Sequence, residues 1–370
     1  MHNREPFIRV IKRDEIGFGK RLLIRLIAIL LSLVVCAVFI FAITHSNPVS
    51  VYGSLVSGAI GTSRRTWSTL RDTMILLAVA LAITPAFKMR FWNIGAEGQI
   101  LVGGIVTAGI MRSFGDHLHP IVLFICMIAA SMLAGLIWAI IPGFFKAIWN
   151  TNETLFTLMM NYIAIQITAF FSMLWEAKKG SGTIGIINQK TQSGWISTAF
   201  LPGIFGKFNY SINVMIILLL TVLMYIYLSY SKQGYEISVV GQSENTARYA
   251  GINVKKVILR TVAISGALSG FTGFLLVSGS SHTISTNTAG GRGFTAIVVS
   301  WLAKFNPFIM IVISFFLVFM SNGSIQIASE FQLNESASEV ITGIILFFIL
   351  GSEFFINYSL VFGRRRKEAA

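Results

Sequence analysis

The sequence predicts an all-α polytopic membrane protein with about ten transmembrane segments. Only 12% of the 370 residues are charged, whereas a soluble globular protein carries about 25%. The apolar set A, V, I, L, M, F, W, Y and C makes up 54% of the chain, and much of it occurs in long runs. A chain of this composition cannot cover its apolar surface with its own polar groups, so we expect a lipid environment.

Ten apolar runs approach the length of about 20 residues that a helix needs to cross the hydrocarbon core. We expect segments near 22–44, 73–87, 97–112, 120–142, 155–175, 211–230, 258–279, 293–304, 307–326 and 338–357. Three of them, 73–87, 97–112 and 293–304, are short and rich in glycine or alanine. The sequence leaves open whether these three cross fully or are re-entrant.

The net charge of +14 is distributed so that it predicts an orientation. If the N-terminus is cytoplasmic and all ten segments cross, 20 of the 29 Lys and Arg residues lie on the cytoplasmic side. The positive-inside rule then places both termini in the cytoplasm and requires an even number of crossings. The charge thus indicates orientation in the membrane and not a nucleic-acid-binding face. We divide the chain into a basic segment 1–21, a transmembrane domain 22–360 with a cytoplasmic turn at 231–257, and a basic tail 361–370.

Ten crossings divide into five plus five, and an odd number in each half makes any internal duplication an inverted one. Each half contains a short segment opened by glycines, NIGAEGQILVGG at 93–104 and GGRGFTAIVVSWLA at 290–303. Paired Gly-interrupted segments at corresponding positions indicate a central binding site. An equally open alternative is that these glycines only allow close helix packing.

Polar side chains stand at or near bilayer depth in the motif FWNIGAEGQ. They are Asn93, Glu97 and Gln99. An ionisable group at this depth is costly unless it faces protein or water. These side chains either line the solute path and offer hydrogen bonds, or pin a broken helix, and for Glu97 we favour the second role.

The motif NETLFTLMMNYIA predicts a helix with one polar face. Asn152 is the expected N-cap, and Glu153 lies in the first turn, at the positive end of the helix dipole. Glu153, Thr157 and Asn161 recur every four residues and therefore share a face. In lipid such a stripe must turn inward, where it glues helices together or lines a passage, and gluing is the commoner use of Thr and Asn.

The stretch EISVVGQSENTARYAGINVKK, residues 236–256, is too polar to span. It predicts a short helix over 244–250, capped by Ser243, with Gly251 in the left-handed position after its end. Ile252 then packs back toward Ala247. A capped helix on the basic side suits a docking contact, and the alternative is an ordinary connecting loop.

The sequence lacks the motifs of several kinds of catalytic and metal-binding site. There is no GxxxxGK[ST] phosphate loop, HExxH or GxSxG motif, so we expect a transporter subunit without its own ATPase site and not an enzyme. Cys36 and Cys126 lie in apolar runs, and the five histidines do not have metal-ligand spacing, so we expect no metal or bound cofactor. The membrane carboxylates are scattered, which argues against an ion-driven transporter.

Together these motifs resemble the permease family of bacterial ABC importers that includes branched-chain amino acid, ribose-type sugar and nucleoside permeases, especially its nucleoside and simple-sugar branch. FWNIGAEGQ is similar to that branch's FNIGAEGQ, and GRGFTAIVVSWLAKFNP at 291–307 is similar to GYGFTAIAVALLG followed by NP. The resemblance runs from about residue 50 to the last span. Trp92, Arg292, Trp301 and Lys304 depart from the family pattern, which leaves the solute open.

The resemblance implies a multi-pass permease of the bacterial cell membrane that translocates nucleosides. Its partners would be a cytoplasmic ABC ATPase carrying ATP and Mg²⁺, a second permease (a paralogue or a second copy), and an extracellular lipid-anchored solute-binding protein. The residues that match the family's ATPase-coupling segment are Gly241, Ser243, Asn245, Ala247, Arg248, Tyr249, Gly251 and Ile252. The alternatives are a ribose-type sugar permease and, in another class, a channel or secondary transporter without an ATPase.

Overall fold

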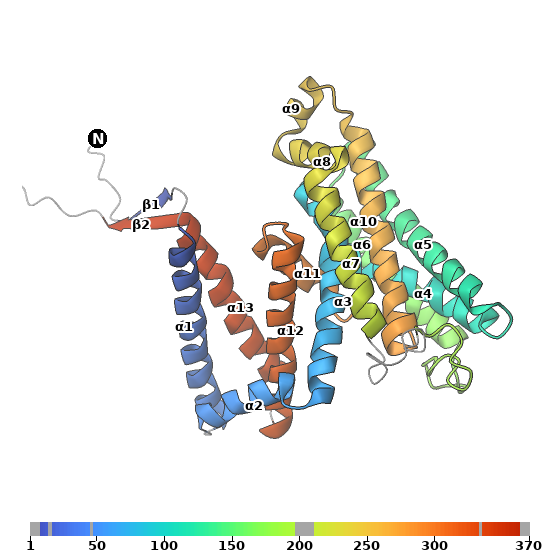
Figure 1. Ribbon diagram of the computed structural model, residues 1–370, viewed down its shortest axis with the longest axis horizontal. Coiled ribbons are helices and arrows are strands. Elements are labelled where there is room, and N and C mark those ends of the chain that lie inside the picture. The colour runs from blue at the N-terminus through green and yellow to red at the C-terminus, as the bar shows by residue number, and fades with distance from the viewer. Residues whose placement is uncertain (1–7, 14–16, 45–46, 197–210, 333–334, 363–370) are drawn as a thin grey trace, which may run out of the picture. The chain divides into compact units, whose positions relative to one another are not determined.

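A computed structural model describes residues 8–13, 17–44, 47–196, 211–332 and 335–362, and it is almost entirely helical (Figure 1). The helices are α1 (Phe18–Thr44), α2 (Pro48–Ile60), α3 (Ser63–Lys88), α4 (Ala96–Phe114), α5 (Pro120–Trp149), α6 (Glu153–Leu174), α7 (Ser211–Tyr230), α8 (Lys232–Gln242), α9 (Glu244–Tyr249), α10 (Val254–Leu276), α11 (Arg292–Leu302), α12 (Pro307–Glu330) and α13 (Glu335–Asn357). A π-helical turn, η2 (Val277–Ser281), extends α10, and two strands are β1 (Ile8–Lys12) and β2 (Tyr358–Phe362). The chain forms two compact units, residues 1–66 with 319–370, and residues 67–318.

Eight helices in the described ranges are long and apolar enough to cross a membrane. They are Gly19–Ile43, Ser63–Lys88, Pro120–Trp149, Glu153–Leu174, Ile212–Tyr230, Val254–Ser281, Pro307–Glu330 and Val340–Asn357. The prediction of an all-helical polytopic protein is confirmed, whereas the count of ten is not. The run at 73–87 belongs to the 26-residue helix α3, which is longer than the sequence indicated because its first turns are polar.

The other two segments predicted to be short are not among the eight spans, α4 for its composition and α11 for its length. Helix α4 has 19 residues and is not among the eight, and α11 has 11 residues. Both begin at glycines: Gly95 precedes α4, and Gly291, with a φ of 72°, precedes α11. The structure thus retains the two Gly-opened helices, and neither is among the eight candidate spans.

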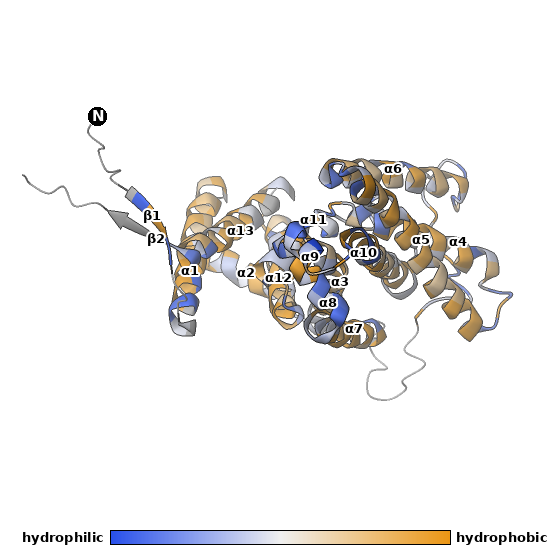
Figure 2. Cartoon of the chain, turned by 90° about the horizontal axis from the view of Figure 1, so that it is seen from above, coloured by the Kyte–Doolittle hydropathy of each residue, from blue (hydrophilic) through white to orange (hydrophobic). Residues whose placement is uncertain are grey.

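Three helices of the 67–318 unit meet at Gly270 of α10. A Cβ added to Gly103 of α4 would lie 2.6 Å from the Cα of Gly270, and one added to Gly135 of α5 would lie 2.8 Å from the same atom. Only small residues allow backbones to approach this closely, which is how helices associate in membranes without a strong hydrophobic drive. Residues on α4 and α5 are mostly hydrophobic, while hydrophilic residues mark α8 and α9 (Figure 2).

Substitution of Gly270 by alanine is expected to destabilise the protein by about 1–3 kcal/mol through overpacking. The new methyl group would press on the Ser131 carbonyl and lie 3.1 Å from the Cα of Gly135. Thermal unfolding of the purified protein would measure the loss. Gly343→Ala in α13 is the control, because a Cβ there meets nothing within 4 Å. An equal melting temperature for both variants would contradict this account of the packing.

The other unit contains strands that the sequence did not indicate. β1 and β2 pair antiparallel, with Ile8 opposite Phe362 and Lys12 opposite Tyr358, and α1 packs along α13. Neither short segment forms a strand alone, because the pairing partner lies at the far end of the chain. The ribbon therefore holds the segment before α1 next to the segment after α13. Beyond Phe362, the predicted basic tail lies outside the described residues.

Candidate functional site

The two Gly-opened helices of the 67–318 unit touch each other at their first turns. Oε1 of Glu97 in α4 accepts a hydrogen bond from the backbone N–H of Gly293 in α11, at 3.1 Å. A Cβ on Gly293 would lie 2.8 Å from Cγ of Glu97, so the contact requires glycine. The carboxylate also faces the positive end of the α11 dipole, which favours its negative charge.

The loop before α4 is closed by a pair of amide side chains. Nε2 of Gln99 donates to Oδ1 of Asn93 at 3.1 Å, and Nδ2 of Asn93 donates to Oε1 of Gln99 at 3.3 Å. Oδ1 of Asn93 also accepts from the Gly95 N–H at 3.1 Å, and its Nδ2 reaches Oγ of Ser265 in α10 at 3.4 Å. Both amides are fully buried. This pairing fixes the bend between α3 and α4.

The polar stripe of α6 holds the same loop from the other side. Oδ1 of Asn161 accepts from the Gly98 N–H at 2.8 Å, while its Nδ2 donates to the Ile94 carbonyl at 2.9 Å. Oγ1 of Thr157 accepts from the Ile94 N–H at 3.2 Å and donates to the Glu153 carbonyl at 2.8 Å. The stripe therefore satisfies backbone groups that the break before α4 leaves without helical partners.

Glu153 begins α6 and has a cationic partner that the sequence did not identify. Its Oε2 lies 2.9 Å from Nζ of Lys146 in α5, and both side chains are largely buried. Asn152 caps the helix as expected, because its side chain accepts from the Leu155 N–H at 3.2 Å. This ion pair could have been predicted from the sequence, because Lys146 lies in the last turn of one helix and Glu153 in the first turn of the next.

The six predicted pathway residues are all buried around the start of α4 and the first turns of α6, and we call this set the polar joint. Its members are Asn93, Glu97, Gln99, Glu153, Thr157 and Asn161, each less than one tenth exposed. Each has a hydrogen-bond or ion-pair partner within its own unit. The joint connects α4, α6 and the start of α11.

An exposed aromatic pair lies next to the polar joint. The rings of Trp92 and Trp301 stack with centroids 5.6 Å apart and planes 22° apart, although they come from the α3–α4 loop and from α11. They are 44% and 45% exposed, and Phe87 packs edge-on against Trp92 at 5.8 Å. Two residues that depart from the family pattern in sequence are thus neighbours in space.

Helix α9 has the capped form that the sequence predicted. Oγ of Ser243 accepts from the Thr246 N–H at 3.3 Å. At the other end Gly251 has a φ of 77°, its N–H donates to the Arg248 carbonyl at 3.0 Å, and the Ile252 N–H donates to the Ala247 carbonyl at 2.9 Å. These two bonds constitute a Schellman motif.

The predicted coupling residues divide into an outer and an inner set. Asn245, Arg248 and Tyr249 are exposed, and Tyr249 is 94% exposed. Ala247 and Gly241 are buried, and a Cβ on Gly241 would collide with the carbonyl of Lys88 at the end of α3. The segment therefore presents one face outward and rests on α3 with the other.

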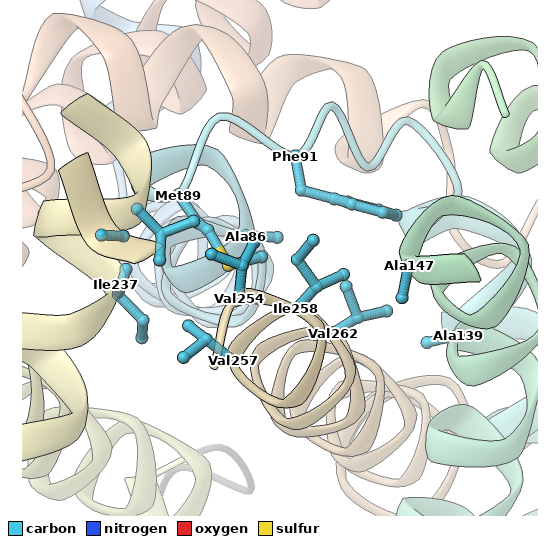
Figure 3. Packing of buried hydrophobic residues seen from close by; sticks show 12 residues of the cluster. Ala86, Met89, Phe91, Ala139, Ala147, Ile237, Val254, Val257, Ile258 and Val262 are labelled. Atoms are coloured by element: carbon cyan, nitrogen blue, oxygen red, sulfur yellow. The ribbon is translucent and has the colours of Figure 1, made fainter. Parts of the chain in front are cut away.

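A hydrophobic cluster joins this segment to the loop before the polar joint (Figure 3). Ile237 belongs to α8 and Val257 to α10, while Met89 and Phe91 come from the loop after α3. The other buried members are Ala86, Ala139, Ala147, Val240, Ala247, Val254, Ile258 and Val262. Phe91 stands two residues before Asn93, so the cluster is continuous along the chain with the joint.

A polar groove of about 460 Å³ opens beside the end of α9. Lys232, Lys256 and Arg260 line it, together with Glu236, whose Oε2 lies 2.8 Å from Nη2 of Arg260. Neither lysine side chain makes an ion pair within the described residues. The groove thus carries an excess of positive charge next to the exposed face of α9.

Comparison with known proteins identifies the family. Residues 65–350 match the family model described as "Branched-chain amino acid transport system / permease component". The guanosine ABC transporter permease protein NupP of Bacillus subtilis (strain 168) is 28% identical over 352 residues, covering 94% of this chain and 98% of NupP. The nucleoside ABC transporter permease protein NupB of Lactococcus lactis subsp. cremoris (strain MG1363) is 26% identical, covering 89% of this chain and 91% of NupB.

A sugar permease is similar to nearly the same degree. The glucose ABC transporter permease protein TsgB13 of Haloferax volcanii is 25% identical, covering 93% of this chain and 91% of TsgB13. The family match covers both Gly-opened helices, the polar joint and α9. With eight helices in its described part that are long and apolar enough to span, the chain is a multi-pass integral protein of the plasma membrane, and it belongs to the family of branched-chain amino acid transport system permease components.

Proposed function

We propose that this chain is the permease of an ATP-binding cassette importer that brings nucleosides into the cell, using ATP that a separate subunit hydrolyses. The observation that carries the solute assignment is the near full-length similarity to a guanosine permease and a nucleoside permease. No cofactor is assigned to this chain; ATP and Mg²⁺ would be held by the ATPase.

The docking surface for the ATPase consists of the exposed face of α9 and the basic groove beside it. Tyr249 offers a large amphipathic anchor, and Arg248 offers a charged one, which are side chains typical of binding hot spots. The lysines of the groove suit acidic groups on the partner. This surface lies in the cytoplasm if both termini do, and the β1–β2 ribbon supports an even number of crossings, since it holds the two ends of the chain together.

The hydrophobic cluster provides a path from the docking surface to the polar joint. Movement of α9 would press on Ile237 and Met89, and from there on Phe91 and the loop that carries Asn93. Packed interiors transmit such displacements because they are bistable and not continuously deformable. We propose that the polar joint positions α4 and α11 on the solute path, because its side chains already have partners inside the chain. Direct hydrogen bonds from the joint to the solute stay a prediction.

The remaining assembly follows from the family. A second permease, either a paralogue or another copy, would complete the path, and an extracellular lipid-anchored binding protein would deliver the solute. Ten crossings in two inverted halves stay a prediction, for which α4 and α11 are the two helices that begin at glycines.

Transport of a simple sugar is the second candidate, which the similarity to a glucose permease favours. Competition for uptake of labelled uridine or adenosine separates the two. We expect unlabelled nucleosides to compete fully and ribose or glucose to leave uptake unchanged. Competition by the sugars alone would show that the solute is a sugar and not a nucleoside. Uptake that persists without the ATPase would refute the ABC mechanism.

A further inference from the structure

A long apolar groove lies within the unit formed by residues 8–66 and 319–362. It runs between α1 and α13 and has a volume of about 560 Å³. Nine of its ten lining residues belong to these two helices, and the tenth is Arg13, which directly follows β1. Ile27 and Leu31 on α1, with Phe347 and Phe355 on α13, are 48–73% exposed. Within this unit the groove walls are thus apolar and open.

The mouth of the groove carries a cation whose side chain has no partner among the described residues. The backbone N–H of Arg13 donates to the Asn357 carbonyl at 2.8 Å, but no described acid pairs with its guanidinium. Arg25 of α1, which follows the groove-lining Ile24, is paired instead, because Nη2 of Arg25 lies 3.3 Å from Oε2 of Glu353. The only ion-pairing acid beside the mouth in the described part of α13 is therefore already engaged.

The N-terminal segment that contains Arg13 is rich in positive charge. Residues 1–25 contain seven Lys and Arg residues against three acids. The described cations on β1, on the residue after it and on the first turns of α1 are Arg9, Lys12, Arg13, Lys20, Arg21 and Arg25. Two of the acids, Asp14 and Glu15, follow Arg13 outside the described residues, and they leave the segment with net positive charge.

Both helices that form the groove are long and apolar enough to span a membrane, which would place the groove at bilayer depth and its charged mouth at one membrane surface. We propose that it binds an anionic phospholipid, with an acyl chain along the apolar walls between α1 and α13 and the phosphate at Arg13. Apolar walls under a basic rim match a lipid of this kind, and juxtamembrane cations attract anionic headgroups by about 1 kcal/mol each. The site involves neither the polar joint nor the ATPase-docking surface, so it stands independently of the transported solute.

Gly351 allows the groove to be filled without disturbing its walls. It lines the groove, it is helical, and a Cβ there would meet nothing within 4 Å. Gly351→Leu therefore places a side chain in the space of the acyl chain. Gly343→Leu is the matched control, because it lies on the same helix, also has open space around a Cβ, and does not line the groove.

The test uses the purified full-length chain with phosphatidylglycerol and phosphatidylcholine of identical acyl chains, and native mass spectrometry counts the retained lipid. We expect the unmodified chain to prefer phosphatidylglycerol by about 5-fold, which corresponds to about 1 kcal/mol. Gly351→Leu should lose retention of both lipids, while Gly343→Leu retains them. Arg13→Gln should remove the preference, while both lipids stay bound through the apolar walls of the groove.

The outcomes that overturn the proposal are distinct. Equal retention by Gly351→Leu and Gly343→Leu would mean that the groove holds no lipid. Equal binding of the two lipids by the unmodified chain would mean that Arg13 does not select an anionic headgroup. A change in oligomeric mass on filling the groove would assign it to a second copy of the chain. Arg13→Gln lies outside the helices, so it tests the headgroup contact even if Gly351→Leu fails to fold.

Discussion

Arg248→Glu combined with Tyr249→Ala is expected to abolish solute uptake while the permease stays in the membrane at its normal level. Both side chains are exposed on α9, with Tyr249 94% exposed, so their loss removes little internal packing. The caps of α9 involve Ser243, Gly251 and the backbone, which the substitutions leave in place. Truncation of an interface anchor costs about 2 kcal/mol or more, so two anchors lost together should reduce uptake by at least about 100-fold.

The measurement is uptake of labelled nucleoside, with the amount of permease in the membrane and the ATPase that copurifies with it determined on the same cells. Lys179→Glu is the control, because it reverses an exposed charge in the segment between α6 and α7. Its uptake should equal that of the unmodified protein. Normal uptake and normal ATPase copurification in the double variant would refute the assignment of α9 as the docking helix.

The local features of α9 were predictable because their causes are local. Ser243 and Gly251 act within a few residues of their own positions, and a cap or a left-handed glycine specifies a helix end wherever the helix packs. The same reasoning identified Asn152 as the cap of α6. It failed for the first turns of α3, where SRRTWSTLRD does not appear apolar although the helix is continuous from Ser63.

Features that depend on distant partners were not predictable. The β1–β2 ribbon needs both ends of the chain, and neither end contains a strand signal strong enough to stand alone. In the polar joint, spacing placed Thr157 and Asn161 on one face of α6, but it gave no information about which backbone groups that face would meet. The Glu97–Gly293 contact joins segments 196 residues apart, so only the folded arrangement of α4 and α11 reveals it.

Asn161 is the member of the polar joint whose loss we expect to be most damaging. Asn161→Leu conserves the approximate size of the side chain but leaves the Gly98 N–H and the Ile94 carbonyl without the bonds of 2.8 and 2.9 Å that they now make. Each buried backbone group left unsatisfied costs about 1–3 kcal/mol. Ile94 and Gly98 flank the start of α4. Loss of these bonds would therefore both destabilise the loop before α4 and displace the start of the helix.

The expected result is a large drop in the melting temperature of the purified permease and loss of uptake in cells. Tyr162→Leu is the matched control, since it is the next residue of α6, is 58% exposed and has no part in the joint. Its melting temperature should stay near that of the unmodified protein. If Asn161→Leu melts and transports as Tyr162→Leu does, then the joint neither stabilises α4 nor positions it on the solute path. A normal melting temperature with lost uptake would instead indicate that Asn161 contacts the solute directly.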